Sequence, residues 1–298
     1  MPTFSAARAD HEFRDAWGVT IHWYVWRAAK PRGVVQLVHG VGEHALRYEH
    51  VAQALVGAGY TVYADDHRGH GATGLEQWGG DASRLGRLGP GGLRAAVDAV
   101  EAFADLVRAE EPGLPFGVVA HSWGSLVAQQ LLDERPDLWD AVVLTGTAYR
   151  MPGSMAAGDL ARGHAQPGGT GFEWISRDPA VQEAMAADPL VVDARVLQLF
   201  GLADTLRLLG RPRRHYRHDV PLSIVVGSDD ALGGERSAVK LARAYVSRSG
   251  LTDVEVRVYD GARHEVLNET NRDEVIGDVV RWLDLRLGAV AGATTAAG

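Results

Sequence analysis

The chain contains no cysteine among its 298 residues, which excludes disulfides, thiolate nucleophiles, zinc-thiolate sites and iron–sulfur clusters. Positive charge is also scarce: 30 Lys and Arg stand against 38 Asp and Glu, and the formal net charge is −8. Because nucleic-acid binding needs clustered cations, we expect no nucleic-acid partner. No apolar run reaches the roughly 18–20 residues that span a bilayer, and no signal-peptide pattern follows Met1. We therefore expect a cytoplasmic protein without an integral membrane segment.

Short apolar segments alternate with helical patterns over most of the sequence. Leu93, Val97 and Val100 form one helical stripe, and a closing helix is predicted over 276–287. Strand-like segments lie at 19–25, 33–38, 60–64, 116–120, 141–144, 221–226 and 254–259. This alternation predicts an α/β protein with a mostly parallel sheet flanked by helices on both faces.

The alternation stops between about residues 147 and 219. Helical patterns occur there, as over 193–209, but no strand pattern does. An insertion of this length between two sheet strands predicts a helical cap. We therefore expect a core formed by 1–146 and 220–287, a cap over 147–219, and a disordered tail over 288–298, which is rich in Ala, Gly and Thr.

A serine stands between a predicted strand and a predicted helix, in Ala120-His121-Ser122-Trp123-Gly124. Small residues two positions before and two after a serine are typical of a strained turn that exposes a nucleophile. The N–H of Trp123, at the start of the helix, would then be an oxyanion donor. The alternative is that Ser122 only caps the helix.

A glycine-rich turn, His39-Gly40-Val41-Gly42-Glu43-His44, follows the first buried parallel strand. Glycines on both sides of Val41 leave its N–H free to aim at the same point as the serine turn, as a second oxyanion donor. The alternatives are a phosphate loop, whose Lys-Ser/Thr is missing, or a plain tight turn. Metal binding by His39 and His44 is a weaker interpretation, because no carboxylate–histidine spacing completes a site.

A base and an acid are available in loops after the last two predicted strands. His264 is the only histidine after Pro221, and it lies in a polar loop past the last strand. Asp229 and Asp230 follow the preceding strand, and their spacing does not choose between them. The order Ser, then Asp, then His is that of a hydrolase triad. The alternatives are a solvated surface histidine and aspartates that only shape a turn.

Five motifs in this order resemble those of the monoacylglycerol lipase/lysophospholipase branch of the serine α/β-hydrolases, over roughly residues 15–287. The segments that carry the resemblance are H-G-x-G-E-H at 39–44, D-x-R-G-H-G at 66–71, Ala-His-Ser-Trp-Gly-Ser at 120–125 where G-H-S-M-G-G is usual, G-x-x-D at 227–230 and G-x-x-H-E at 261–265. The resemblance implies an α/β-hydrolase fold and favours Asp230 over Asp229 as the acid.

The resemblance also implies an activity: hydrolysis of carboxylic esters, often monoacylglycerols, through a Ser122–His264–Asp230 triad and the backbone N–H groups of Val41 and Trp123. It implies no cofactor and no metal. Two alternatives keep the same scaffold. One is a triad enzyme acting on another bond or acceptor, such as an acyltransferase, an amide or carbamate hydrolase or a C–C hydrolase. The other is a non-catalytic binding protein. The sequence does not set an oligomeric state.

The predicted cap supplies apolar residues for an acyl-chain pocket: Trp174, Leu199, Phe200 and Leu202. The alternative is that these side chains only pack the cap onto the sheet. The basic run 211–218 either contacts an anionic lipid surface or is a solvated surface segment. We therefore expect a small ester or monoacylglycerol-like lipid as the substrate, with peripheral lipid contact through the cap.

Overall fold

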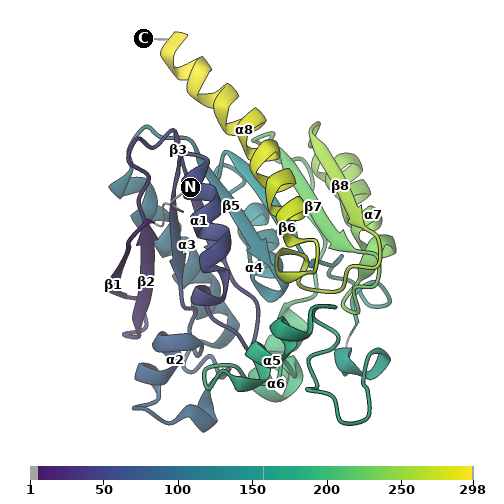
Figure 1. Cartoon of the computed structure of the whole chain (residues 1–298). Coiled ribbons are helices and arrows are strands. Elements are labelled where there is room, and N and C mark those ends of the chain that lie inside the picture. The colour runs from purple at the N-terminus through teal and green to yellow at the C-terminus, as the bar shows by residue number, and fades with distance from the viewer. Residues whose placement is uncertain (1–5, 157, 297–298) are drawn as a thin grey trace, which may run out of the picture.

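The computed structural model describes residues 6–156 and 158–296. Its centre is an eight-stranded sheet in the order β1-β2-β4-β3-β5-β6-β7-β8 (Figure 1). β2 is antiparallel to both β1 and β4, and all other neighbours are parallel. The strands are β1 Arg8–Arg14, β2 Thr20–Trp26, β3 Gly33–Val38, β4 Tyr60–Asp65, β5 Phe116–His121, β6 Ala141–Thr145, β7 Leu222–Gly227 and β8 Val254–Tyr259. The predicted α/β-hydrolase fold, with its mostly parallel sheet, is confirmed.

The composition of each strand follows from its place in the sheet. Every residue of β3 to β7 is buried, because helices cover both faces of the sheet there, and β3, β5, β6 and β7 are accordingly rich in Val. β1 is an edge strand and carries Arg8, Asp10 and Glu12 on exposed positions. Charges on an edge oppose pairing with another chain.

Helices cover the sheet in two layers. Apolar residues of α3, α4 and α7 pack into one buried cluster, and those of α1 and α8 pack into a second cluster on the opposite face. The helices are α1 Glu49–Gly57, α2 Gly71–Gln77, α3 Gly92–Glu110, α4 Ser122–Glu134, α5 Pro179–Ala187, α6 Val196–Arg207, α7 Gly234–Ala244 and α8 Arg272–Ala296, with shorter turns η1 Ala45–Tyr48, η2 Ala82–Arg84, η3 Leu160–Gly163, η4 Tyr245–Ser249 and η5 Val266–Asn268.

The segment between β6 and β7 lies below the sheet in Figure 1 and contains η3, α5 and α6. The helix predicted over 193–209 corresponds to α6, but it is not continuous. Gly201, with φ 77° and ψ 169°, interrupts it between two short helical pieces. The apolar residues before and after Gly201 therefore do not lie on one continuous helix face.

The closing helix α8 extends beyond its predicted end and projects from the body of the molecule in Figure 1. It runs to Ala296 and so includes residues 288–296, for which the sequence predicts a disordered tail. Residues 297 and 298 lie outside the described residues. Among the helices described, none is both long enough and apolar enough to cross a bilayer.

Candidate active site

Ser122 occupies a strained turn between β5 and α4. Its φ is +50°, a left-handed value that non-glycine residues rarely adopt. Gly124 shows why the turn needs small residues: an added Cβ would lie 2.3 Å from the carbonyl oxygen of His39 and 2.6 Å from that of Val38. The N-cap residue of α4 is His121, and it makes no side-chain capping bond. Ser122 is therefore not the cap of this helix, and its side chain is free for another contact.

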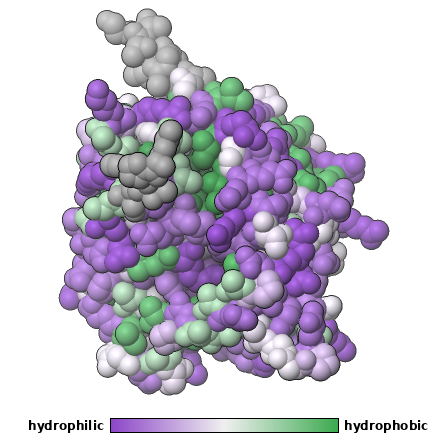
Figure 2. Space-filling model, viewed as in Figure 1, coloured by the Kyte–Doolittle hydropathy of each residue, from purple (hydrophilic) through white to green (hydrophobic). Residues whose placement is uncertain are grey.

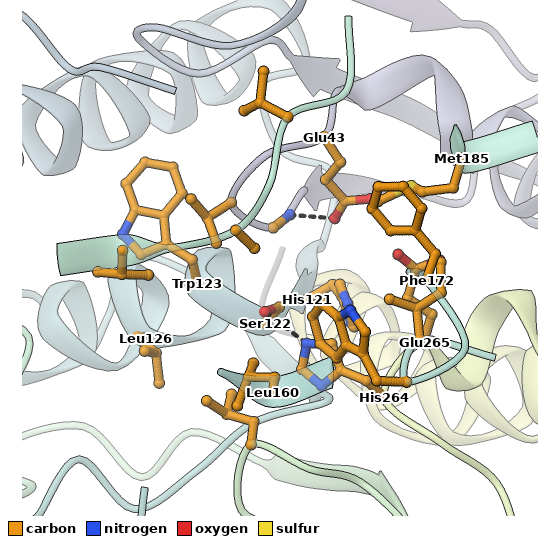
Figure 3. A pocket seen from close by; sticks show the side chains of 18 of the residues that line it. Glu43, His121, Ser122, Trp123, Leu126, Leu160, Phe172, Met185, His264 and Glu265 are labelled. Carbon is orange, nitrogen blue, oxygen red and sulfur yellow. Dashed lines mark hydrogen bonds between the residues drawn. The ribbon is translucent and has the colours of Figure 1, made fainter. Parts of the chain in front are cut away.

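Ser122, Asp230 and His264 meet at the carboxyl edge of the sheet. His264 Nε2 lies 2.8 Å from Ser122 Oγ (Figure 3), and His264 Nδ1 lies 2.9 Å from Asp230 Oδ1. Nδ1–H donates to the carboxylate, so Nε2 is left to accept the serine proton, as a general base must. Asp229 does not reach this site: its side chain is 56% exposed, and its Oδ2 lies 3.8 Å from His164 Nδ1.

The charges around His264 favour its protonated form. Burial alone would lower the pKa of the imidazole, because the charged ring loses its water. The negative charge and hydrogen bond of Asp230 outweigh this effect, and Glu265 and Glu43 add to it, so the pKa of His264 is raised above its usual value. The ring therefore takes up a proton more readily than a solvated histidine.

A largely apolar cavity lies beside Ser122 and His264 (Figure 3). The space inside it that a water-sized molecule can occupy is about 50 Å³, within about 580 Å³ of space between atoms that includes open solvent. Val41 and Trp123, the two predicted oxyanion donors, both line it. The apolar residues around it are Leu126, Leu160, Phe172, Trp174, Ile175, Met185, Val192, Ala194, Val196, Leu208 and Leu232.

The turn Gly40–His44, called the oxyanion loop below, holds the peptide that carries the Val41 N–H. His39 Nδ1 lies 2.7 Å from the carbonyl oxygen of Gly40, the other end of that peptide. His39 Nε2 accepts the His67 N–H at 3.0 Å, so the ring proton sits on Nδ1 and donates to Gly40. In a trans peptide the N–H points away from the C=O. His39 therefore constrains the direction of the Val41 N–H from the N-terminal side of Val41, a role that the sequence did not reveal.

The second predicted oxyanion donor, the N–H of Trp123, lies at the start of α4. As the second residue of the helix, its N–H has no helical carbonyl one turn earlier to bind. Its indole ring lies against the rings of His70 and Phe200, with centroids 5.3 and 5.2 Å away, and Figure 3 shows it pointing away from His264. The ring of Trp123 therefore does not contact the ring of His264.

A buried ionic network joins the oxyanion loop to the loop of His264. Arg47 contacts Glu43 and makes two parallel bonds of 2.8 Å to Glu265. Glu43 Oε1 also accepts the Gly40 N–H, at 2.6 Å. Burial raises the pKa of Glu43; burial would also raise that of Glu265, but Arg47 outweighs it and lowers the pKa to about 2. Both acids were visible in motifs, whereas nothing in the sequence indicated Arg47.

Two groups of His and Glu side chains in the described part of the chain lie close enough to hold a metal ion. In the group of Glu43, His121 and Glu265, the Arg47 guanidinium already binds both carboxylates. Burial and the nearby charge of His264 lower the pKa of His121 to about 3, so this ring is neutral. The second group, Glu12, His22 and Glu76, is on the surface, and its glutamates contact the two different ring nitrogens of His22. One ion cannot replace both of these contacts.

The four residues predicted to line an acyl pocket have different surroundings. Trp174 lines the cavity, with its ring centroid 5.0 Å from that of His264. Phe200 packs on Trp123, and Leu199 packs against Gly86. Leu202 is 66% exposed, and Leu199, Phe200 and Leu202 are not among the residues around the cavity.

The family model described as serine aminopeptidase, S33, matches residues 29–271. The chain belongs to this S33 serine hydrolase family. It is 36% identical to the monoacylglycerol lipase of Mycolicibacterium smegmatis over 293 residues, which cover 94% of this chain and 98% of the relative. It is 26% identical to the monoglyceride lipase of Homo sapiens over 275 residues, 88% and 85% of the two chains.

A solved structure extends the likeness to three dimensions. This S33 hydrolase matches a thermostable carboxyl esterase from Bacillus coagulans with a TM-score of 0.77 and 25% identity, over 94% of this chain and 99% of the other. The resemblance to monoacylglycerol lipases found in the sequence is thus confirmed. The protein is a serine hydrolase that acts on carboxylic esters.

Proposed function

We propose that this hydrolase cleaves monoacylglycerols, with Ser122 as the nucleophile, His264 as the base and Asp230 as the group that orients it. The observation that carries this proposal is the pair of contacts at His264, 2.8 Å to Ser122 and 2.9 Å to Asp230, at the wall of an apolar cavity. The printed names of the two lipase relatives support a monoacylglycerol as the ester.

In the first half of the reaction, Ser122 Oγ attacks the ester carbonyl carbon while His264 Nε2 takes its proton. The carbonyl oxygen becomes an oxyanion that the N–H groups of Val41 and Trp123 stabilise. Each such donor contributes about 2.7–4 kcal/mol to transition-state stability in serine hydrolases. The intermediate then expels the alcohol oxygen, which takes the proton from His264, and an acyl–Ser122 ester remains.

In the second half, a water molecule gives a proton to His264 Nε2 and attacks the acyl carbon. The same two N–H groups stabilise the second oxyanion. Ser122 Oγ leaves, recovers the proton from His264, and a free fatty acid is released. Asp230 stays charged throughout and stabilises the imidazolium that forms in each half.

The cavity suits an ester substrate better than the amino-terminal end of a peptide. A carboxylate that receives the α-amine of a peptide must be free to pair with it. Glu43 and Glu265 do line the cavity, but the Arg47 guanidinium already binds both. The remaining walls are mostly apolar, which suits an acyl chain.

Residues 147–219 are proposed to act as the cap that closes this cavity and contacts a lipid surface. The support is the position of α5 and α6 beside the site and the exposure of Leu197, Leu202 and Leu206, which are 55%, 66% and 54% exposed. On the face shown in Figure 2 hydrophobic residues gather in small groups among hydrophilic ones, so a lipid contact would be peripheral. A cytoplasmic location stays a prediction of the sequence.

The test is to compare the parent enzyme with Ser122→Ala on 1-monoolein, diolein, lysophosphatidylcholine and a short p-nitrophenyl ester. The parent should react with a fluorophosphonate probe and turn over monoolein fastest, while Ser122→Ala should lose both labelling and turnover of every ester. Ser247→Ala, an exposed serine away from the site, is the matched control and should behave as the parent. Undiminished turnover in Ser122→Ala would overturn the triad. A preference for another lipid would overturn the substrate assignment alone.

A further inference from the structure

The cap segment that follows α5 contacts the oxyanion loop at two points. Val192 N–H donates to the carbonyl oxygen of Gly42 at 2.9 Å. Asp188 Oδ2 lies 2.8 Å from His44 Nε2. The approach is close enough that a Cβ on Gly42, whose φ is +77°, would lie 2.3 Å from the Val192 carbonyl oxygen. The cap therefore rests directly on the loop that carries a predicted oxyanion donor.

The contact between Asp188 and His44 is sheltered and directional. Their side chains are 25% and 9% exposed. The second carboxylate oxygen of Asp188 accepts the Leu190 N–H at 2.9 Å, which fixes the turn after α5. Burial would raise the pKa of Asp188, but the hydrogen bonds from His44 and from the Leu190 N–H outweigh it and lower the pKa. The carboxylate is therefore charged, and His44 Nε2–H donates to it.

Different parts of the fold hold the backbone on the two sides of Val41. On its N-terminal side the core holds Gly40, through Glu43 at the N–H and His39 at the carbonyl oxygen. On its C-terminal side the cap holds the Gly42 carbonyl oxygen through Val192. The direction of the Val41 N–H depends on the dihedral angles at both sides, so the core alone does not set it.

We propose that Asp188 is a positioning residue of the oxyanion hole, acting through His44. Its carboxylate holds His44 and, with the Val192–Gly42 bond, keeps the C-terminal side of the oxyanion loop in the conformation that aims the Val41 N–H at the reacting carbonyl. This inference rests on the proposed function, because Val41 matters only if Ser122 forms an oxyanion there.

The cap also contacts the His264 loop, at a separate place. Glu265 N–H donates to Ile175 O at 2.7 Å, and His264 N–H donates to Trp174 O at 3.5 Å. These bonds lie before α5, whereas Asp188 lies after it. A change at Asp188 should therefore disturb the oxyanion donor and leave the base in place.

The experiment uses the full chain as Asp188→Ala, Asp188→Asn and the matched control Asp193→Asn, an exposed acid of the same cap segment that pairs with Arg195. Active sites are counted by titration with a fluorophosphonate, so misfolded protein does not enter the rates. Per titrated site, Asp188→Ala should lower kcat on a short p-nitrophenyl ester about tenfold with KM changed less than about twofold, since a misaligned donor loses part of the transition-state stabilisation. The inhibition constant of an alkylboronic acid, which forms a tetrahedral adduct on Ser122, should rise by the same factor.

The Asn variant and a double mutant separate positioning from simple stabilisation of the fold. Asp188→Asn keeps an oxygen acceptor for His44 and should recover most of kcat. In a His44→Ala background, Asp188→Ala should have a much smaller effect than in the parent, because only its bond from the Leu190 N–H is left to lose. Asp193→Asn should match the parent in both readouts.

One result would overturn the positioning role of Asp188, and another would overturn the proposed function. If the parent labels at Ser122 and Asp188→Ala keeps kcat per site and boronate affinity within twofold of the parent, the positioning role is overturned and the proposed function stands. If the parent neither labels at Ser122 nor hydrolyses esters, the proposed function is wrong and the inference falls with it.

Discussion

The imidazole of His39 donates from Nδ1 to the carbonyl oxygen of Gly40, 2.7 Å away, while its Nε2 accepts the His67 N–H. Burial holds the pKa of His39 well below its usual value, so the ring stays neutral in this arrangement. One side chain thus uses both nitrogens to hold the peptide whose N–H is the proposed oxyanion donor.

His39→Ala should therefore impair catalysis more than substrate binding. Without the ring, the Gly40–Val41 peptide loses its partner and the Val41 N–H is no longer fixed, so we expect kcat to fall about 10–100-fold with little change in KM. Steady-state kinetics on a short ester, normalised to titrated sites, checks this. A variant that lowers only the number of titrated sites would show that His39 serves folding alone.

Substitution of the two adjacent aspartates should affect kcat very differently. Asp230→Asn removes the charge that orients His264 and should lower kcat about 10³–10⁴-fold, as the loss of a triad carboxylate does. Asp229→Asn alters an exposed side chain and should leave kcat within about twofold of the parent. The pair is its own matched control, since both changes are isosteric and neighbouring. Equal effects would contradict the assignment of Asp230.

Activity should rise with pH through an inflection that belongs to His264. The ring must be neutral to accept the Ser122 proton, and its pKa is raised, so kcat/KM should fall as the pH drops through a value above about 6.5. The stability from the charged His264–Asp230 pair has the opposite trend: it is present below the unfolded pKa and is lost as the pH rises through the folded one. The pH profiles of kcat/KM and of urea unfolding check both signs. An activity inflection below about 6 would contradict the raised pKa.

Removing Arg47 should destabilise the fold strongly. Arg47→Met leaves Glu43 and Glu265 buried side by side without their shared cation, and loss of one partner of a buried pair costs about 3–5 kcal/mol. The free energy of unfolding from urea titration is the measurement. Arg281→Met, at a guanidinium that is 71% exposed, is the control and should change it by less than about 1 kcal/mol. A loss of that small size in Arg47→Met would mean that the network contributes little.

The sheet and the turn that carries the proposed nucleophile were predictable because they depend on local pattern. The buried strands are apolar at nearly every position, and Ser122 follows one of them at a turn of small residues. His264 could be placed as well, since it is the only histidine after Pro221. Asp230 could not be separated from Asp229 by spacing; only the resemblance favoured it, because the choice depends on which side chain turns inward.

Contacts between distant segments could not be predicted. The ring of His39 accepts a hydrogen bond from the His67 N–H. Arg47 binds Glu265, which lies 218 positions further along the sequence. In α6, apolar residues suggested one helix from 193 to 209, and Gly201 was the available signal that it breaks. Of the four residues predicted for an acyl pocket, Trp174 lies at the cavity, whereas Leu199, Phe200 and Leu202 do not, because the sequence did not show which side chains of the cap turn inward.

The Arg47 contacts join residues from opposite sides of the inserted cap, since Glu43 precedes it and Glu265 follows it. These contacts and the pairing of β6 with β7 hold the N-terminal and C-terminal portions of the core together. They do so without the covalent link that the cap segment provides. A single protease cut near residues 164–171 should therefore yield two fragments that co-elute under native conditions and separate only in denaturant.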